Sequence, residues 1–445
     1  MNELLQTLLQ RIDQPVARHS LLDQYYTGTQ SLAFLSPEAK TALGQRFGRM
    51  ASNIPRLAVT ALAERLRITG FVCDEPILWD DWIANDMDQL SGVAHREALL
   101  FGDSYVMVWA DASGNPKVTV ESAKQVAVLN DPGTRQITAA VKRWETERTT
   151  EAVLYLPDRI VRYRANATGS TISGFKPIDE IANPLGVVPV VAIRNSDRIL
   201  DEYGASEIDD LIPLVDALNK SLADMMVTSE FVGRPRRWAT GIELAEEPVL
   251  DAAGHPTFDS DGNPITREVN PIPEGNRAMI SEAADAKFGQ LAAADLAGYE
   301  ASVRVILGQI MAVSTLPAHY VGVFTDNPAS ADALRAAEAS LTARAEARQA
   351  TFGRGWEQVG RLMVAVRNGV DPATVRVNVE WSDAATRSVA QEADAVVKLY
   401  QAGLLPASYA LKKLGYTDAE VADIRTARRV EALDAQGITF GGNAA

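Results

Sequence analysis

The chain has 445 residues, 47% of them hydrophobic, which is enough for one large domain or for several of ordinary size. It carries 43 basic and 58 acidic residues, a net charge of −15, so its outer surface is unsuited to nonspecific binding of nucleic acid, although DNA held loosely in a channel is not excluded. Its one cysteine, Cys73, excludes an intramolecular disulfide and fits a reducing compartment. We expect no membrane span, because no apolar run approaches about 18 residues. We also expect no signal peptide, because the N-terminus carries acid early and has no apolar core followed by small residues.

The beginning of the chain is expected to be helical. Residues 1–70 are predicted to form helices, the first with an apolar face that ends at Pro15 and a later one that starts at Asn53. A further helix is predicted over Trp79–Leu100, with Gly102 as its stop signal.

The pattern then changes to short runs rich in Val, Tyr and Trp, which favour strands. Asp, Gly and Pro separate the runs, as in Asp111–Pro116 and Asp131–Gly133, which is typical of turns. These runs predict an antiparallel meander rather than a βαβ repeat: Ser104–Trp109, Lys117–Val120, Gln125–Leu129, Gln136–Trp144, Glu151–Leu156 and Arg159–Arg164, with Val187–Ile193 able to close it.

Two long amphipathic helices are predicted around an irregular insert. The first follows Ser206 and Asp209, which fit a variant capping box, and its apolar spacing continues to about Phe231, a length of roughly 35–40 Å. The insert, residues 233–281, holds six prolines and two nearly identical turns, and predicts a small β-rich module. The second helix is predicted from an apolar face that begins at Phe288, again roughly 40 Å long.

The remainder is expected to be mostly helical. After a mixed loop from Ser314, a stretch rich in Ala, Arg and Glu predicts one long helix to Asn368, which the glycines at 353, 355 and 360 would bend. Residues 375–381 alternate as a strand does, and the chain beyond Asp383 predicts further helices.

We find no motif for catalysis or metal binding. The four histidines are far apart in sequence, and HExxH, CxxC, GxSxG, GxxxxGK[ST] and GxGxxG are all absent. The run Asp259-x-Asp261-x-Asn263 departs from a calcium loop in its glycine and final positions, which favours a simple turn. Asp80 and Asp81 are adjacent, so on a helix they would diverge, and acidic residues in a first helical turn are the better account.

One compact basic cluster includes an aromatic residue: Arg234, Arg236, Arg237 and Trp238. It could contact DNA phosphates or an acidic partner. Equally, it could be a solvated helix exit with Trp238 packed locally. The sequence leaves both interpretations open.

The order of these segments resembles the portal proteins of tailed bacteriophages, especially those of long-tailed phages of actinobacteria. The resemblance covers nearly the whole chain and rests on these segments: ALLFGDSYVMVWAD (98–111) leading into a β meander, IDDLIPLVDALNKSLADMM (208–226), the insert, YEASVRVILGQIM (299–311), ASADALRAAEASLTARAEARQATF (329–352) and WSDAATRSVAQEADAVVKLYQAGLLP (381–406). The resemblance implies an α+β portal-type fold without cofactor, metal or catalytic residues.

The resemblance also implies a division of the chain into named parts. These are an N-terminal wing (1–203), a first stem helix (204–232), a clip (233–284), a second stem helix (285–313), a tunnel loop (314–328), the rest of the wing with a long helix and strand (329–381), and a helical crown (382–445).

The implied function is that of a ring, usually dodecameric, at one capsid vertex of the virion, assembled in the host cytoplasm. Double-stranded DNA would pass through its channel without sequence specificity, near His319, Tyr320 and Phe324. The implied partners are other copies of the chain, the large subunit of the packaging terminase, the head–tail connector, the major capsid protein and a scaffold, and no membrane. The channel face is expected to be neutral or acidic, with sparse arginines such as Arg304, because strong attraction to phosphate would slow sliding.

Two other classes of function remain open from the sequence alone. One is another connector or assembly protein of the virion, against which the two-stem layout argues. The other is a metal-dependent enzyme with an unrecognised site, which would be a monomer or dimer with metal-dependent turnover.

Overall fold

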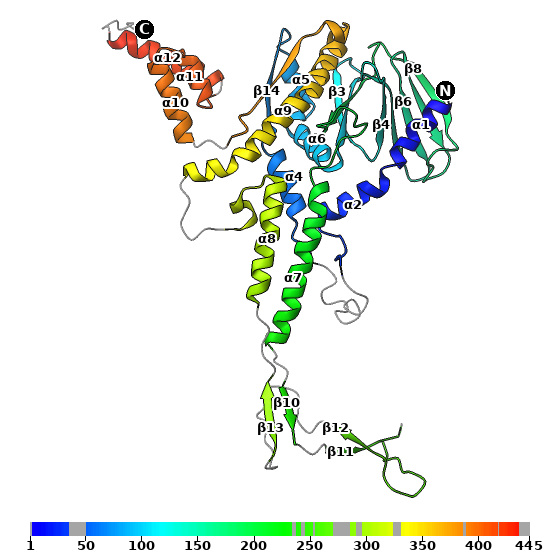
Figure 1. Ribbon diagram of the computed structural model, residues 1–445. Coiled ribbons are helices and arrows are strands. Elements are labelled where there is room, and N and C mark those ends of the chain that lie inside the picture. The colour runs from blue at the N-terminus through cyan, green and yellow to red at the C-terminus, as the bar shows by residue number, and fades with distance from the viewer. Residues whose placement is uncertain are drawn as a thin grey trace, which may run out of the picture.

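The computed structural model describes residues 2–34, 50–233, 237–241, 245–251, 254–269, 285–290, 296–323, 331–385, 389–416 and 418–435. Figure 1 shows a broad body of mixed helices and strands, a stem of two long helices below it, and an arm of short strands at the far end of the stem. A group of helices formed by the C-terminal part stands beside the body. The fold is therefore α+β, as predicted.

The N-terminal helices agree with the sequence only in part. Helices α1 (Asn2–Asp13), α2 (Val16–Thr27) and α4 (Ile54–Ala63) were expected, with Pro15 at the break between the first two. However, the region also contains strand β1 (Ile68–Cys73). This strand pairs with β14 (Val377–Trp381), which comes much later in the sequence. A local periodicity gives no sign of such a distant partner.

The helix predicted over Trp79–Leu100 is divided in two, α5 (Leu78–Ala84) and α6 (Met87–Phe101). Asp86 lies between them with φ of 55°, a left-handed conformation that no continuing helix can contain. Gly102 ends α6, as predicted, with φ of 94°.

The predicted meander is two separate antiparallel sheets. In the first, β2 lies between β3 and β9, so β9 pairs with β2 and does not close the far end of the meander. The second has the order β4-β5-β6-β7-β8. Their bounds are β2 Asp103–Ala110, β3 Pro116–Ser122, β4 Val126–Asn130, β5 Ile137–Glu145, β6 Thr150–Tyr155, β7 Arg159–Ala165, β8 Lys176–Ala182 and β9 Val190–Arg194.

Strand β8 was missed because every one of its residues is exposed, so its sequence lacks the alternation of a half-buried strand. One face of this five-stranded sheet is covered by α1. The helix contributes its predicted apolar face to a core shared with β4 to β7: Leu5, Leu8, Leu9 and Ile12. The larger core lies between α2, α4, α6, the three-stranded sheet and α9 (Ala331–Asn368).

Helix α9 runs continuously through the three glycines that were expected to bend it. Two of them also allow close packing against the sheets. A Cβ on Gly355 would stand 2.6 Å from Ile193 Cδ1, and one on Gly360 would stand 2.9 Å from Val377 Cγ1. These glycines let the helix approach β9 and β14 more closely than any other residue would allow.

The stem consists of α7 (Ile212–Gly233), preceded by the short 3₁₀ helix η1 (Asp209–Leu211), and α8 (Ala297–Ser314). The second helix starts at Ala297, later than predicted, because Phe288 belongs to β13 (Lys287–Gln290), which pairs with β10 (Arg237–Thr240). With 22 and 18 residues, the helices are about 33 and 27 Å long.

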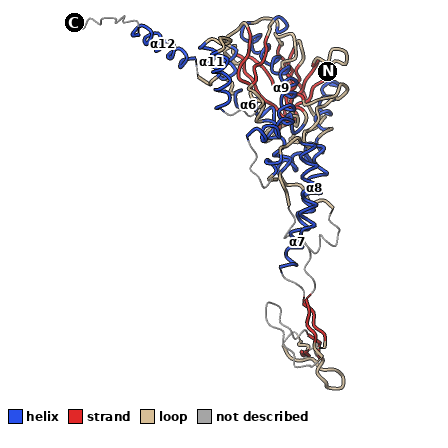
Figure 2. Tube along the Cα trace, turned by 60° about the vertical axis from the view of Figure 1, so that its left-hand side comes forward, coloured by secondary structure: helices blue, strands red, loops and turns tan. Residues whose placement is uncertain are grey.

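The arm carries a second ribbon, β11 (Ala245–Pro248) with β12 (Thr266–Val269). The two predicted turns follow β11, and in each an aspartate, Asp251 or Asp259, accepts hydrogen bonds from the backbone of its own turn. The insert is thus β-rich within its described residues, as predicted. Figure 2, turned from the first view, shows the arm extending away from the body along the stem.

The remaining described elements are η2 (Ala318–Val321), η3 (Pro372–Thr374), α10 (Val389–Gln401), α11 (Ala407–Lys413) and α12 (Asp418–Ala435). No described helix is long and apolar enough to cross a membrane.

Candidate functional site: the junction of stem and body

The chain enters the stem by crossing closely over the end of α6. Gly204 lies against Gly102 there, and the Asp103 carboxylate binds the chain at this crossing. One carboxylate oxygen of Asp103 accepts the Gly204 backbone N–H at 2.9 Å, and the other accepts Arg194 Nε at 2.7 Å. The start of the stem is therefore attached to both β2 and β9.

The predicted capping box forms only in part, ahead of η1, the short 3₁₀ helix that leads into α7. The Asp209 carboxylate accepts the Ser206 N–H at 3.2 Å, as a box requires, but the Ser206 hydroxyl accepts the N–H of Ile208 at 3.3 Å and not that of Asp209. Asp209 also binds Arg18 at 2.5 Å, which joins α2 to the start of the stem. Further along α7, Asp216 accepts the Tyr25 hydroxyl at 2.7 Å.

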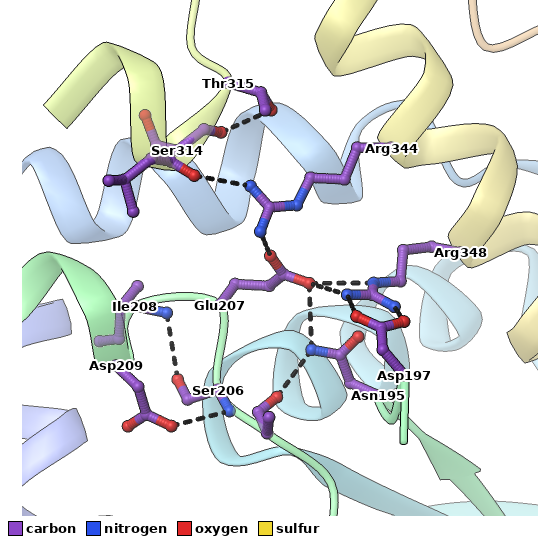
Figure 3. A network of polar contacts seen from close by, with 12 residues as sticks. Asn195, Asp197, Ser206, Glu207, Ile208, Asp209, Ser314, Thr315, Arg344 and Arg348 are labelled. Atoms are coloured by element: carbon purple, nitrogen blue, oxygen red, sulfur yellow. Dashed lines mark hydrogen bonds and ion pairs between the residues drawn. The ribbon is translucent and has the colours of Figure 1, made fainter. Parts of the chain in front are cut away.

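A buried carboxylate, Glu207, lies at the centre of the junction (Figure 3). Its side chain is 4% exposed and accepts from Arg348 at 2.9 Å, from Arg344 at 3.1 Å and from the Asn195 amide at 3.1 Å. Arg344 also donates to the Val313 carbonyl at 3.2 Å, in the last turn of α8. Helix α9 thereby holds the beginning of one stem helix and the end of the other.

Arg348 completes this network with a two-pronged ion pair to Asp197, at 2.5 and 2.8 Å. Burial alone would lower the pKa of the Arg348 guanidinium, but its bonds to Asp197 and Glu207 outweigh burial and raise that pKa above its usual value. The same Arg348 bond holds the pKa of the Asp197 carboxyl below its usual value. Both partners are therefore charged at neutral pH.

The loop that follows α8 is fixed to the body by a second network. Arg65 binds Glu338 of α9 at 2.9 Å and the Ala384 carbonyl at 2.7 Å, and its guanidinium reaches the Tyr320 hydroxyl at 3.4 Å. His319 Nε2 lies 3.4 Å from the other Glu338 oxygen. Of the residues expected near DNA, His319 and Tyr320 are thus half-buried at this contact, and Phe324 lies outside the described residues.

The two stem helices contact each other along their length, and the cations on them are paired with acids one turn away. Thr228 donates to the Tyr299 hydroxyl at 3.2 Å between the helices. Arg304 binds Glu300 at 2.9 Å, and Lys220 binds Asp224. In total the two helices carry two basic and four acidic residues.

The basic cluster predicted at the stem exit is only partly described. Arg234 and Arg236 lie outside the described residues, and Arg237 is described only as the first residue of β10. Trp238 is 44% exposed and its ring lies over Gly289 of the paired strand, where a Cβ would be 2.3 Å away. Trp238 thus packs locally yet keeps an exposed face.

The candidates for catalysis or metal binding have structural roles. Asp81 is buried and binds Arg367 with both oxygens, whereas its neighbour Asp80 is exposed, so the pair diverges as expected. His95 is fully buried and accepts the Trp356 Nε1–H at 2.7 Å. Among the described residues, no three His, Cys, Asp or Glu side chains gather where a metal could bind.

Comparison with known proteins identifies the family. A family described as "Phage portal protein, SPP1 Gp6-like" matches residues 36–432. The portal protein of Mycobacterium phage D29 is 32% identical over 406 residues, which cover 86% of this chain and 80% of that protein. The chain belongs to the phage portal protein family. The portal protein of Mycobacterium phage L5 is 30% identical over 408 residues, with the same two coverages.

Among solved structures, a chain from the neck of a native gene transfer agent particle is similar with a TM-score of 0.44 and 14% identity, over 90% of this chain and 99% of that one. As a phage portal protein, the chain is a non-enzymatic structural component of the virion at the capsid vertex. This confirms the resemblance and the absence of enzymatic activity that the sequence indicated.

No pattern in the sequence pointed to the Glu207 network. Arg344 and Arg348 lie one turn apart on a helix rich in Ala, Arg and Glu, a pattern typical of a solvated face. Yet the Arg348 side chain is only 6% exposed. The only available signal was Glu207 itself, an acid inside the capping box where the stem begins.

Proposed function

We propose that copies of this chain form a dodecameric ring whose channel passes double-stranded DNA during genome packaging and ejection. Membership of the portal family and the two-helix stem projecting from the body carry the proposal. In a head-to-tail ring, equivalent stems stand side by side and enclose a channel. The parts of the subunit are then the wing (1–203 and 329–381), the stem (204–232 and 297–313), the clip (233–296), the tunnel loop (314–328) and the crown (382–445). The clip is taken to extend to 296 because β13 pairs with β10.

The charge of the stem supports sliding of DNA. The acidic residues of α7 and α8 outnumber the basic ones, and Arg304 and Lys220 are each paired with an acid. Such a surface offers few phosphate contacts, and each phosphate contact that forms would slow transit.

In this proposal, DNA passes near the tunnel loop, which contains His319, Tyr320 and Phe324. Its support is its position, because the loop begins at Ser314 where α8 ends. The contacts of Arg65 with Tyr320 and Glu338 hold the described part of the loop against the body. In the proposal, the tunnel loop narrows the channel.

We assign the arm to contact with the large subunit of the terminase during packaging and with the head–tail connector afterwards. The arm offers exposed apolar residues for such partners, among them Trp238, Leu250, Phe258 and Ile265. The cluster of Arg234, Arg236 and Arg237 would add charge at the same end of the stem. The wing and crown would contact the major capsid protein and the scaffold.

The test is to purify the full chain, measure particle mass by mass photometry and image the particles in negative stain. Rings with a central hole, twelve times the 48.1 kDa subunit mass, are expected. Packaging in a phage that carries the Arg304→Glu exchange should remain efficient, whereas an added lysine or arginine without an acidic partner on the stem should slow packaging. A monomer at all concentrations, also when co-produced with capsid protein, would contradict the proposal.

A further inference from the structure

A large cleft in the body has no role in the junction described above. It has a volume of about 950 Å³ and lies between the β4–β5 turn, the segment before β9, and the second half of α9. This is at the upper end of the roughly 300–1,000 Å³ typical of binding pockets. The cleft is therefore large enough to receive several side chains of a partner.

The lining of the cleft is cationic with an apolar part. Its charged residues are Arg135, Arg194, Arg361 and Asp131. Arg194 is paired with Asp103, and Asp131 Oδ1 already accepts two backbone N–H groups and a hydroxyl of its own turn.

The two other arginines retain bonding capacity. Arg135 is exposed and has no ion pair among the described residues. Arg361 lies 3.8 Å from Glu357, and its Nε is buried without a hydrogen-bond partner in the described chain. Val187, 38% exposed, gives the cleft an apolar wall. The chemistry of the cleft thus fits an acidic segment that carries an apolar side chain.

The same chain presents such a segment, the turn Asp74-Glu75-Pro76-Ile77 between β1 and α5, which we call the acidic knob. Ile77, the last residue of the knob, is 41% exposed. No lysine or arginine occurs in residues 68–95, and Asp74 and Glu75 have no ion pair among the described residues. Asp80 adds a further exposed carboxylate in the first turn of α5.

The acidic knob and the cleft lie on opposite sides of α9. Gln358, Arg361 and Leu362 line the cleft. On the other side, Leu78 of α5 contacts α9 at Gly360, and Asp81 binds Arg367. At about 100° per residue, positions 360 and 367 point roughly opposite to the first three. One subunit therefore cannot fill its own cleft with its own knob.

We propose that the acidic knob of one subunit inserts into the cleft of its neighbour in the ring. Complementary features on opposite sides of a subunit produce a head-to-tail contact, the kind that repeats and closes into a ring. Asp74 and Glu75 would meet Arg135 and Arg361, and Ile77 would pack against Val187. This inference rests on the proposed ring and specifies one surface that builds it.

Site-directed disulfide formation tests the contact. In a Cys73→Ser background, the chain carrying both Ile77→Cys and Val187→Cys should give, under mild oxidation, a ladder of covalent multimers. Two single-cysteine chains mixed before assembly should stop at dimers. A disulfide requires Cβ atoms about 4 Å apart, so only a real contact reacts efficiently. The matched control replaces Ile77→Cys by Leu200→Cys, which is 93% exposed and should give no ladder.

A charge exchange gives an independent readout. Arg135→Glu should raise the subunit concentration for half-assembly about three- to tenfold, and Glu75→Arg in the same chain should restore it. Loss of folding would not be restored in this way. Rings that form normally without a ladder, and without response to Arg135→Glu, would overturn the knob contact and leave the proposed function intact. Absence of rings in the unmodified chain would overturn both.

Discussion

Gly102 and Gly204 lie backbone to backbone where the chain enters the stem. A Cβ on Gly102 would stand 2.1 Å from the Gly204 carbonyl oxygen, and one on Gly204 would stand 1.9 Å from the Gly102 oxygen. Because the obstructing atoms belong to the backbone, no side chain can move aside. The stem is thus positioned on the body by a contact that only two glycines can make.

Alanine at Gly102 should therefore destabilise the subunit by about 2–4 kcal/mol, through both its φ of 94° and the steric clash. The matched control is Gly114→Ala, at a φ of 82° with nothing within 4 Å of its Cβ position, which should cost only about 1 kcal/mol. Urea unfolding of both variants measures the difference. Equal losses would show that the close crossing contributes nothing.

The Glu207 network should be as sensitive to the loss of one partner as the glycine crossing is to an added methyl group. Glu207→Gln removes the charge that pairs with Arg344 and Arg348 while keeping the shape, and leaves two guanidinium groups partly unpaired in a buried site. We expect a loss of about 3 kcal/mol, with faster hydrogen exchange at the first turn of α7. Glu300→Gln, which breaks an exposed pair with Arg304, is the control and should change stability by less than about 0.5 kcal/mol. A Glu207 variant as stable as this control would refute the role of the network.

The pH dependence of stability should come largely from two buried histidines. Burial lowers the pKa of His95 to about 3, and burial followed by the nearby Arg18 charge lowers that of His19 to about 4, both from 6.5. Below pH 6.5 the unfolded chain therefore binds protons that the folded chain does not. Stability is fully present above pH 6.5 and decreases as the pH falls toward 4.

For each histidine the decrease should approach about 1.4 kcal/mol per pH unit. The measurement is urea unfolding between pH 7 and 5, above the range where most carboxylates titrate. His95→Gln should reduce the slope, whatever its effect on absolute stability. A slope that is unchanged in the His95 variant would contradict this assignment.

The sequence predicted those parts of the fold whose pattern is local. The apolar spacing of α1 and α7 is a local signal, and so are the runs of Val, Tyr and Trp between turn residues that predicted strands within β2 to β7. Strand β1 was not predicted because its partner β14 is far away in the sequence. Likewise, nothing local distinguishes buried Arg348 from the exposed Arg354 on the same helix, because burial depends on where Glu207 and Asp197 arrive.

Two glycines in long helices should respond to alanine in opposite directions. In α9, Gly355 faces Ile193, and a Cβ would lie 2.6 Å from its Cδ1 and 3.3 Å from the Ala192 carbonyl oxygen. Gly355→Ala should therefore cost about 1–3 kcal/mol through overpacking. In α8, nothing lies within 4 Å of a Cβ on Gly308. Gly308→Ala should stabilise the isolated subunit by about 0.5–1 kcal/mol through helix propensity.

The free energies of unfolding of the two variants, measured side by side by heat and by urea, test this prediction. The comparison is matched because both substitutions add the same methyl group to a helix interior. Destabilisation by Gly308→Ala in the isolated subunit would mean that α8 requires flexibility at this point. Tolerance of Gly355→Ala would mean that α9 can move away from β9 at little cost. In that case the glycines of α9 would have to be explained by bending of the helix, as its sequence first suggested, and not by its close contact with the sheet.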